Sequence, residues 1–432
     1  MNNQGWLRRR QIAVAGGINS AFPVFVDRAE GNWVVDVEGH RYLDFIGGIG
    51  VQSLGHNRPE IVSAIQDALD GIIHTSFHTV MYPRYVEVSE QLAALVPGPW
   101  EKQVAFFNSG AEAVENALKI ARQYTGKPGI ISFNQGFHGR TYGALSATDK
   151  TNPYKVGFGP FIPDVYRVPS AYCYRCPVAV NRATCQIECL DMVQSVITEE
   201  IGADQVAALI IEPEQGEGGF IPMPGEFLRG LRHFCTQHQI LFIADEIQAG
   251  LGRTGKMWSI EHSGVAPDLL VTAKALGGGL PLSAVVGRRD ILAGMAPGSI
   301  GSTYGGNPVA LAAAKVVLNL MAQEDIPGQA AQMGNWLRSR ALEWQAQYPQ
   351  IGDVRGLGAM IGLEFVHPGN LEPDRATCQA VIQAAFHRGL LLTKAGLADN
   401  VIRLLPPLTI SRADAEDGMN RLESAINDVL VR

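Results

Sequence analysis

The chain has 432 residues, with 35 Lys and Arg against 42 Asp and Glu, so its formal net charge is −7. This balance excludes the strongly basic surface typical of nucleic-acid-binding proteins, and no apolar run approaches the roughly 20 residues needed to cross a bilayer. Six cysteines are too few for a disulfide-stapled secreted fold, and the first residues do not resemble a signal peptide, so we expect a cytoplasmic protein.

The order of apolar runs along the chain predicts the fold class. Residues 23–50 contain two alternating runs that meet at the turn-prone Glu38–Gly39, which predicts a β-hairpin. Further on, short apolar runs alternate with segments long enough for crossover helices, and they lie at 104–107, 129–133, 206–211, 240–244 and 268–273. This alternation predicts an α/β fold with a mostly parallel central sheet sandwiched by helices.

The two ends of the chain predict a second, smaller α+β domain. Amphipathic helical patterns follow residue 325, with short strand patterns in GAMIGLEFV and NVIRLLPPL. We expect residues 1–55 to be the N-terminal segment of this small domain, 56–325 to be the large domain, and 326–432 to be the C-terminal small domain. Within the large domain, one crossover helix is clear from apolar side chains at Val114, Ala117, Leu118 and Ala121.

Polar residues follow several predicted strands at the point where each strand ends. They are Asn108 to Ala111 after 104–107, Glu212 after 206–211, Asp245 after 240–244, and Lys274 after 268–273. Because functional groups gather at the carboxyl ends of parallel strands, these residues are candidates for one site.

Lys274 is the candidate with the most distinctive chemistry. It follows an apolar run and precedes Leu276-Gly277-Gly278-Gly279, which leaves open space around the amine. A desolvated lysine has a lowered pKa and is a nucleophile suited to forming a Schiff base with a carbonyl. The alternative is a structural lysine whose ammonium pairs with Asp245 or Glu212, and the residue chemistry leaves both interpretations open.

Ser109-Gly110-Ala111-Glu112 opens the clear helix and also has two interpretations. Its small residues leave the first-turn N–H groups free to bind a phosphate. The same Ser-x-x-Glu pattern is a capping box with Ser109 as the N-cap, and the pattern alone favours the cap.

Two arginines are candidates for anion binding. Arg403 lies inside the apolar run VIRLL, where a guanidinium requires an anionic partner. That partner is either a structural carboxylate or the carboxylate of a substrate. Arg140, in FHGR, raises the same question, and two such arginines near one edge would suit an amino acid or a dicarboxylate.

A group of cysteines has the spacing Cys173-x2-Cys176-x8-Cys185-x3-Cys189. This spacing leaves three interpretations open: a zinc or iron–sulfur site, free thiols, or a structural crosslink. Cys235 and Cys378 lie in helical patterns and are expected to be core residues.

Six motifs together resemble the class III aminotransferases, which are pyridoxal 5′-phosphate (PLP) enzymes of fold type I. In chain order they are NSGAEAVENALKIAR, GFHGRTYGAL, IIEPEQGEGGF, IADEIQAGLGRTGK, TAKALGGGLPLSA and GSTYGGNPVA. The resemblance extends from DFIGGIGVQSLGH to NVIRLLPPLTI, so it covers nearly the whole chain. It implies PLP as cofactor, the Schiff-base role for Lys274, and a homodimer, with pairing of dimers into tetramers left open.

The resemblance also implies the residues that bind PLP. Lys274 would bind it covalently and then act as general acid and base, and Asp245 would pair with the pyridine nitrogen. Ser109, Gly110 and Ala111 would hold the phosphate, with Thr303 reaching the neighbouring subunit's site. The remaining cofactor residues would be Phe137, His138, Glu212, Ile247 and Gln248. Transamination requires no metal, and we assign no metal ligand in this site.

The resemblance implies four substrate-binding residues. Arg403 would bind the α-carboxylate of glutamate or 2-oxoglutarate, and Glu217 would neutralise Arg403 when the donor lacks an α-carboxylate. Arg140 would bind the far carboxylate, with Ile49 at the entry. NPYKVGFGPFIPDVYRVP and the VENALKIAR helix resemble the 4-aminobutyrate branch, which implies transfer from an ω-amino acid to 2-oxoglutarate, giving succinate semialdehyde and glutamate from 4-aminobutyrate.

Three alternatives stay open at this point. Within the fold they are acetylornithine or ornithine transamination and PLP-dependent racemisation of an amino acid, and outside enzymes the alternative is a non-catalytic protein that binds PLP or an amino acid. His78, Glu214 and Gly50 depart from the residues usual in the family, and His78 bears most on the choice of donor.

Overall fold

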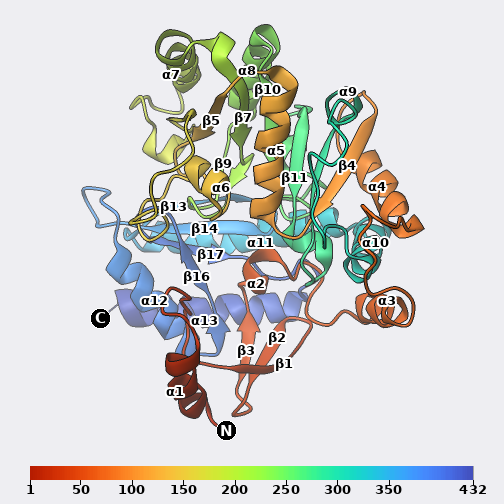
Figure 1. Cartoon of the computed structure of the whole chain (residues 1–432). Coiled ribbons are helices and arrows are strands. Elements are labelled where there is room, and N and C mark those ends of the chain that lie inside the picture. Colours follow the sequence, from red (N-terminus) through yellow and green to blue (C-terminus); the bar gives the residue numbers. More distant parts are fainter. Residues whose placement is uncertain (432) are drawn as a thin grey trace.

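The computed structural model describes residues 1–431 and places a seven-stranded sheet at the centre of the chain (Figure 1). The strand order is β4-β12-β11-β10-β7-β5-β6, and only β12 runs antiparallel to its neighbours. The strands are β4 (Lys102–Phe107), β12 (Ser283–Arg288), β11 (Leu269–Thr272), β10 (Leu241–Asp245), β7 (Val206–Ile211), β5 (Gly129–Phe133) and β6 (Val165–Val168). The predicted α/β class with a mostly parallel sheet is confirmed.

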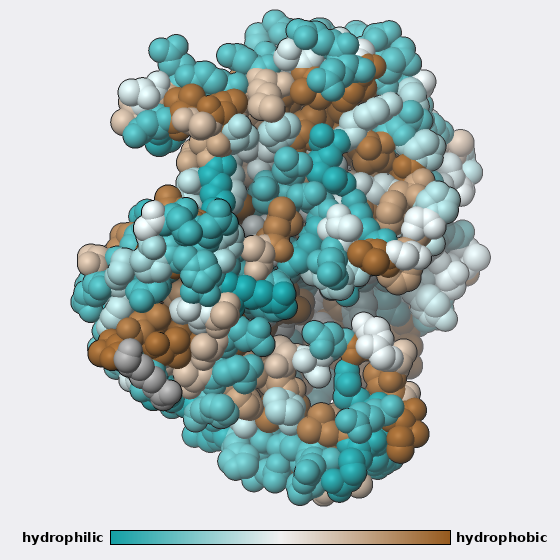
Figure 2. Space-filling model, turned by 90° about the vertical axis from the view of Figure 1, so that its left-hand side faces the viewer, coloured by the Kyte–Doolittle hydropathy of each residue, from teal (hydrophilic) through white to brown (hydrophobic). Residues whose placement is uncertain are grey.

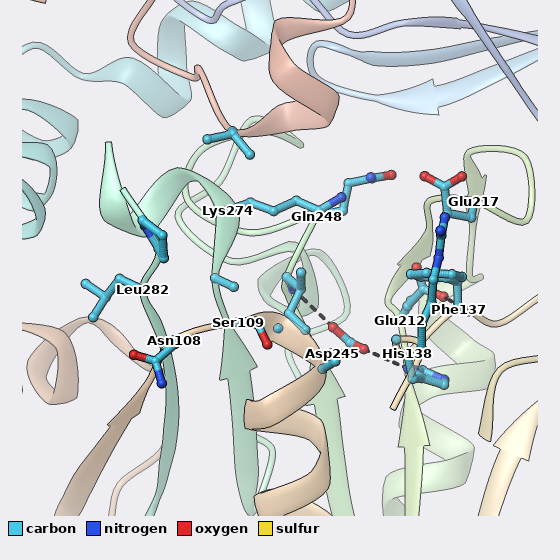
Figure 3. A pocket seen from close by; sticks show the side chains of 18 of the residues that line it. Asn108, Ser109, Phe137, His138, Glu212, Glu217, Asp245, Gln248, Lys274 and Leu282 are labelled. Atoms are coloured by element: carbon cyan, nitrogen blue, oxygen red, sulfur yellow. Dashed lines mark hydrogen bonds and ion pairs between the residues drawn. The ribbon is translucent and has the colours of Figure 1, made fainter. Parts of the chain in front are cut away.

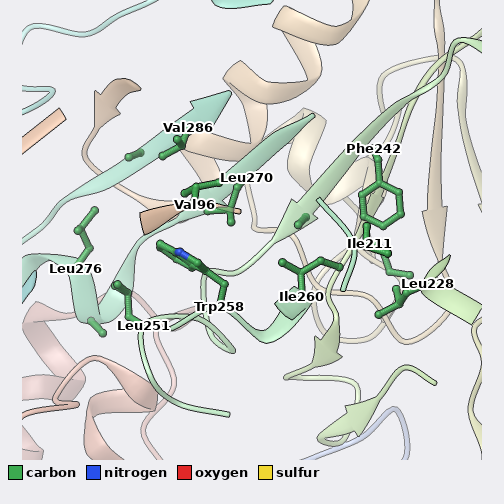
Figure 4. Close-up of a cluster of buried hydrophobic side chains, with 14 of the residues drawn as sticks. Val96, Ile211, Leu228, Phe242, Leu251, Trp258, Ile260, Leu270, Leu276 and Val286 are labelled. Atoms are coloured by element: carbon green, nitrogen blue, oxygen red, sulfur yellow. The ribbon is translucent and has the colours of Figure 1, made fainter. Parts of the chain in front are cut away.

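Helices cover both faces of this sheet. They are α3 (Pro59–Leu69), α4 (Pro83–Leu95), α5 (Gly110–Thr125), α6 (Tyr142–Ala147), α7 (Glu188–Ser195), α8 (Gly225–His238), α9 (Arg289–Leu292) and α10 (Pro308–Gln323). Because both faces are covered, every residue of β7 is buried, as the near-continuous apolar run VAALII predicts. On one face Trp258 is fully buried among Leu251, Leu270 and Leu276 (Figure 4).

Helix α5 connects β4 to β5, so its N-terminus lies at the edge of the sheet where β4 ends. Val114, Ala117, Leu118 and Ala121 are buried, as their spacing predicts. The side chain of Ser109 caps the helix by accepting the N–H of Glu112 at 3.3 Å. The Glu112 carboxylate reaches back one residue beyond the cap and accepts the N–H of Asn108 at 2.9 Å, so only half of the expected capping box forms.

Two smaller sheets are built from the two ends of the chain. The first has the order β1-β2-β3-β15, and its strands are β1 (Val26–Glu30), β2 (Trp33–Asp36), β3 (Arg41–Asp44) and β15 (Leu390–Leu391). Strands β2 and β3 form the predicted hairpin, while β15 comes from the C-terminal part and pairs with β3 in parallel. The second is antiparallel and consists of β13 (Ile351–Leu357), β14 (Met360–Phe365), β17 (Val401–Leu404) and β16 (Thr393–Ala395).

One apolar core joins these two ends. Leu43 and Phe45 from the N-terminal part pack with residues of the C-terminal helices and strands, including Leu337, Cys378 and Ile402. The helices of this region are α11 (Ile326–Gln347), α12 (Arg375–His387) and α13 (Arg412–Leu430). The predicted core positions of Cys235 and Cys378 are confirmed, since both are fully buried. The exact domain boundaries stay a prediction.

The remaining elements are short or peripheral. They are α1 (Asn3–Ala13), α2 (Gly47–Gly50), and a ribbon of β8 (Glu214–Gln215) and β9 (Ile221–Pro222). The face shown in Figure 2 is mostly hydrophilic, with apolar patches separated by polar side chains. Over residues 1–431, no helix combines the length and apolar character required to span a bilayer.

Candidate active site

The order of the parallel strands brings the predicted polar residues to one edge of the sheet. Strands β11, β10, β7 and β5 are successive neighbours and parallel, so their carboxyl ends lie side by side. Lys274, Asp245 and Glu212 follow three of these strands, and His138 follows the fourth. Figure 3 shows their side chains around one cavity.

The cavity has a volume of about 470 Å³, within the range of small-molecule sites. It is lined by most of the predicted site residues: Ser109, Gly110, Ala111, Phe137, His138, Arg140, Glu212, Glu217, Asp245, Ile247, Gln248 and Lys274. Asn108, one of the polar residues predicted to gather after 104–107, also lines it. Residues that the sequence did not single out complete the lining: Val51, Gly139, Ala273, Gly279, Leu280, Pro281 and Leu282. Gly139 and Ala273 lie next to a predicted residue in the chain, so adjacency was the available signal for them, while 279–282 belong to the motif that contains Lys274.

Lys274 projects its amine into this cavity without an ionic partner. Within residues 1–431, no carboxylate oxygen lies within 4.0 Å of its Nζ, so the expected alternative of a pair with Asp245 or Glu212 is not seen. Burial lowers the pKa of Lys274 to about 8. Its backbone has a φ of +45°, a strained conformation for a non-glycine residue that is common at functional sites. The arrangement favours the nucleophilic amine.

Asp245 is held by two hydrogen bonds. Its Oδ2 lies 2.7 Å from Nδ1 of His138, and its Oδ1 accepts the backbone N–H of Ile247 at 3.1 Å. Burial acts to lower the pKa of His138, but the hydrogen bond and charge of Asp245 outweigh it, so this pKa is raised. His138 therefore fixes the orientation of the Asp245 carboxylate and supports its negative charge.

The Glu212 carboxylate anchors two loops at the cavity wall through hydrogen bonds. Its two carboxylate oxygens accept the N–H groups of Phe137 and Gly216, each at 2.8 Å. Burial raises the pKa of Glu212 to about 7. Glu212 thus holds the two loops that carry Phe137 and Glu217.

The N-terminus of α5 presents an anion-binding cradle. The first N–H groups of a helix have no partner within the helix, and Gly110 and Ala111, which carry two of these groups, line the cavity. An added Cβ at Gly110 would lie 2.9 Å from Cδ1 of Ile247, so a larger residue there would displace the Ile247 side chain at the cavity. The helix end at Ser109 therefore has both predicted features: the Ser109 side chain caps it, and the following N–H groups are available to an anion.

Arg403 does not itself line the cavity, but it forms an ion pair with Glu217, which does, so the structural carboxylate expected as one possible partner of Arg403 is found. The Arg403 side chain is only 4% exposed, while that of Glu217 is 21% exposed. Burial acts to raise the pKa of Glu217, but the charges of Arg403 and Lys274 together keep it below its usual value. The pair thus keeps a buried guanidinium neutralised beside the Lys274 amine.

Tyr154 is a site residue that the sequence analysis missed. Its ring lies under the Arg140 guanidinium at 4.6 Å and meets the Phe137 ring edge-on at 5.4 Å. Arg140 is otherwise exposed, so the ring restricts where its guanidinium points. Its motif, NPYK, gave no chemical signal because a tyrosine in a loop is common.

Several predicted residues lie outside the cavity lining. Ile49 is 45% exposed in α2, and Thr303 is also exposed. His78 packs against Gly301, near Thr303. Glu214 is fully buried in β8, and burial raises its pKa well above the usual value, which favours the neutral acid.

Comparison with known proteins identifies the family. The family model described as aminotransferase class-III matches residues 15–426. A probable 4-aminobutyrate aminotransferase of Bacillus subtilis is 41% identical over 422 residues, covering 98% of this chain and 97% of that protein. The chain belongs to the class III aminotransferases. A 5-aminovalerate aminotransferase of Pseudomonas putida is 40% identical over 429 residues, covering 99% of each chain.

Solved structures of transaminases share this class III fold. An (S)-enantioselective ω-transaminase from Thermomicrobium roseum has a TM-score of 0.92 at 30% identity, covering 100% of this chain and 99% of that one. An amine transaminase from an uncultivated Pseudomonas species, solved with PLP bound, has a TM-score of 0.89 at 31% identity, covering 96% and 99%. The predicted fold type I architecture is confirmed.

Class III aminotransferases depend on PLP, and the residues of this cavity fit that cofactor. An amine of lowered pKa faces the cavity from Lys274, and the helix N-terminus offers N–H donors for a phosphate. Gln248 also lines the cavity, and its buried Oε1 has no hydrogen-bond partner among the described residues. The chain is therefore a PLP-dependent aminotransferase.

Proposed function

We propose that this enzyme transfers the amino group of 4-aminobutyrate, or of a close ω-amino acid, to 2-oxoglutarate. From 4-aminobutyrate the products are succinate semialdehyde and glutamate. The observation that carries the proposal is the Arg403–Glu217 ion pair beside Lys274. Relatives named for 4-aminobutyrate and 5-aminovalerate, each about 40% identical over nearly the whole chain, support the same substrate class.

The ion pair suits a donor whose reacting carbon bears no carboxylate. With such a donor, an unpaired Arg403 would face an apolar methylene chain, which is costly for a buried guanidinium. Glu217 removes that cost by staying on Arg403. The far carboxylate of the donor is then bound by Arg140, which Tyr154 holds at the cavity wall.

The acceptor uses the same site with the ion pair opened. The α-carboxylate of 2-oxoglutarate binds Arg403 bidentately and displaces Glu217, whose partial exposure gives it room to move. The distal carboxylate binds Arg140 in both half-reactions. One cavity therefore accepts two unlike substrates by moving a single side chain.

The residues that hold PLP in this proposal line the cavity. When bound, PLP supplies an electron sink for the carbon that loses its proton. Asp245, oriented by His138, would pair with the pyridine nitrogen, and the Gln248 amide would donate to the phenolic oxygen. Phe137 and Ile247 would hold the ring, while Ser109, Gly110 and Ala111 would hold the phosphate. Lys274 would hold the cofactor through its Nζ, and the same amine would move the proton at the donor carbon.

The same proposal requires a homodimer. Ile49 and Thr303 are exposed and lie outside the lining of their own chain's cavity, so a second copy is the partner for which they are suited. Exposed apolar side chains of the N-terminal half support such an interface, among them Ile72, Ile73, Val80 and Met81. Light scattering on the purified protein tests the dimer, and a monomeric active enzyme would contradict it.

The visible spectrum of the holoenzyme tests the substrate assignment. We expect 4-aminobutyrate or 5-aminovalerate to convert the cofactor to its aminated form, and 2-oxoglutarate to reverse the change. Arg140→Ala should weaken this response to 4-aminobutyrate, whereas Arg338→Ala, at an exposed position of α11 outside the cavity, is the matched control.

Other outcomes separate the alternatives. Conversion by ornithine or N-acetylornithine alone would overturn the donor assignment but keep the reaction class. Loss of optical activity from an amino acid without oxo acid would indicate a racemase. A bound cofactor that no amino donor converts would indicate a non-catalytic binding protein.

A further inference from the structure

A second, smaller cavity lies in the loop between β6 and α7, and it shares no lining residue with the active site. Its volume is about 20 Å³, and Cys173, Cys176, Cys185 and Cys189 all line it. The four thiols are free, without a disulfide. The loop lies on the face of the molecule shown in Figure 2. The proposed reaction uses none of these residues.

The four cysteines come as two pairs from two local structures. Cys173 begins a single 3₁₀ turn and Cys176 directly follows it, while Cys185 precedes α7 and Cys189 lies in its first turn. The spacings, two residues within the first pair and three within the second, fall in the range of structural zinc sites. Tertiary folding brings the two pairs to one cavity.

Donor groups already surround Cys185. Its Sγ accepts the backbone N–H of Ile187 at 3.3 Å, and the Arg182 guanidinium lies beside it. Such outer donors stabilise thiolate sulfur in metal sites. Ile187 has a φ of +69°, an uncommon conformation for a β-branched residue, so this turn is held against local strain.

We infer that these four cysteines bind one Zn²⁺ ion. The cavity of about 20 Å³ is of the size that one small ion or one water molecule occupies. Tetrahedral Zn–S bonds of ~2.3 Å place the sulfurs about 3.8 Å apart. In the described structure no three of these sulfurs lie within 4.8 Å of one another, so binding draws them inward. Zn²⁺ displaces the protons of the four thiols to water, which leaves the loaded site negative beside the Arg182 guanidinium, a group that also pairs with Glu226.

The bound ion would brace a contact with the C-terminal sheet. Tyr172, which also lines the small cavity, donates its hydroxyl to Glu364 of β14. Glu364 pairs with Arg355 at 2.7 Å, and Arg355 donates to the carbonyl oxygen of Gly219 at 2.7 Å. Gly219 lies two residues after Glu217, so the cysteine loop supports the segment that carries the proposed substrate switch.

Metal analysis of the untagged full-length holoenzyme tests this site. We expect about one Zn²⁺ per chain, and less than a tenth of that in Cys173→Ala/Cys176→Ala. The matched control is Cys235→Ala/Cys378→Ala, which removes two buried thiols elsewhere and should retain the ion. If the first variant does not fold, wild-type protein stripped of metal and reloaded with Co²⁺ gives a second measurement, the thiolate-to-cobalt charge-transfer band.

Each possible result either supports the zinc site or overturns it. Stoichiometric zinc that depends on the four cysteines, or the cobalt band in wild type, supports the site. Absence of metal together with absence of the cobalt band overturns it, as do disulfides among these cysteines, bound iron with sulfide, or zinc that Cys173→Ala/Cys176→Ala retains. None of these readouts depends on aminotransferase activity, so the zinc site and the substrate proposal stand or fall separately.

Discussion

Replacing Glu217 with glutamine removes one charge from the ion pair at the cavity while keeping the shape of the side chain. Arg403, 4% exposed, then has no anion when the donor is 4-aminobutyrate. With glutamate as donor, the α-carboxylate itself neutralises Arg403. The substitution should therefore impair the 4-aminobutyrate half-reaction selectively.

The size of the effect follows from the contact that is lost. A hydrogen bond to a charged group contributes about 1.5–3 kcal/mol. Because Glu217 is 21% exposed, water compensates in part, and the full cost of breaking a buried pair does not apply. At 1.36 kcal/mol per tenfold in rate, we expect kcat/KM for 4-aminobutyrate to fall about 10- to 150-fold.

Stopped-flow absorbance of each half-reaction provides the assay. Holoenzyme is mixed with 4-aminobutyrate or with glutamate, and the rate of cofactor amination is measured against donor concentration. Glu214→Gln is the matched control, because Glu214 lies three residues away, is fully buried and has a pKa raised well above its usual value. Its glutamine variant resembles the neutral acid and should leave both half-reactions unchanged.

Two results would refute the reasoning. Equal losses with both donors would mean that Glu217 maintains the site as a whole and does not act as a switch. Unchanged rates with 4-aminobutyrate would mean that Arg403 needs no counter-ion in that half-reaction.

Four further predictions concern Lys274 and Gly110, which line the cavity, and Tyr154, which packs against two of its lining residues. Lys274→Ala should lose turnover yet still bind PLP without a covalent bond, as measured by dialysis and fluorescence, and turnover at the wild-type rate would contradict the assignment. The rate at which apoenzyme captures PLP should rise with pH through about 8, because burial lowers the pKa of Lys274 and only the neutral amine attacks; a rise centred near 10.5 would contradict this. Gly110→Ala should raise the Kd for PLP about tenfold or more, because the new Cβ would lie 2.9 Å from Ile247, and unchanged affinity in equilibrium titration would show that the cradle tolerates it. Tyr154→Leu should raise KM for 4-aminobutyrate about two- to fivefold at constant kcat, because Arg140 loses the ring beneath it, and a fall in kcat alone in steady-state assays would assign Tyr154 another role.

Local patterns in the sequence determined the elements and the sites at their ends. The apolar runs predict strands β7 and β10, and the 3.6-residue period of apolar residues predicts helix α5. The reason is that the buried face of an element must be apolar, so apolar residues recur in the sequence with the period of that element. The rule that functional residues follow parallel strands selects Asp245 and Lys274 from the sequence alone.

Patterns of residues also made the family recognisable, and PLP follows from the family. The sequence determines the family more fully than it determines the role of each single residue. The sequence offered two interpretations of Lys274, two of Arg403, and three of the cysteine group, because each residue type serves several chemical purposes.

Only the tertiary structure decided which partner each of these groups has. In this structure the Lys274 amine has no ion-paired carboxylate among the described residues. Arg403 pairs with a glutamate 186 residues away, and the Tyr154 ring lies under Arg140. The tertiary structure also gathered four cysteines around one cavity. Such contacts depend on strand order and on the direction of each side chain, which arise from packing between distant segments and leave no periodic trace in the sequence.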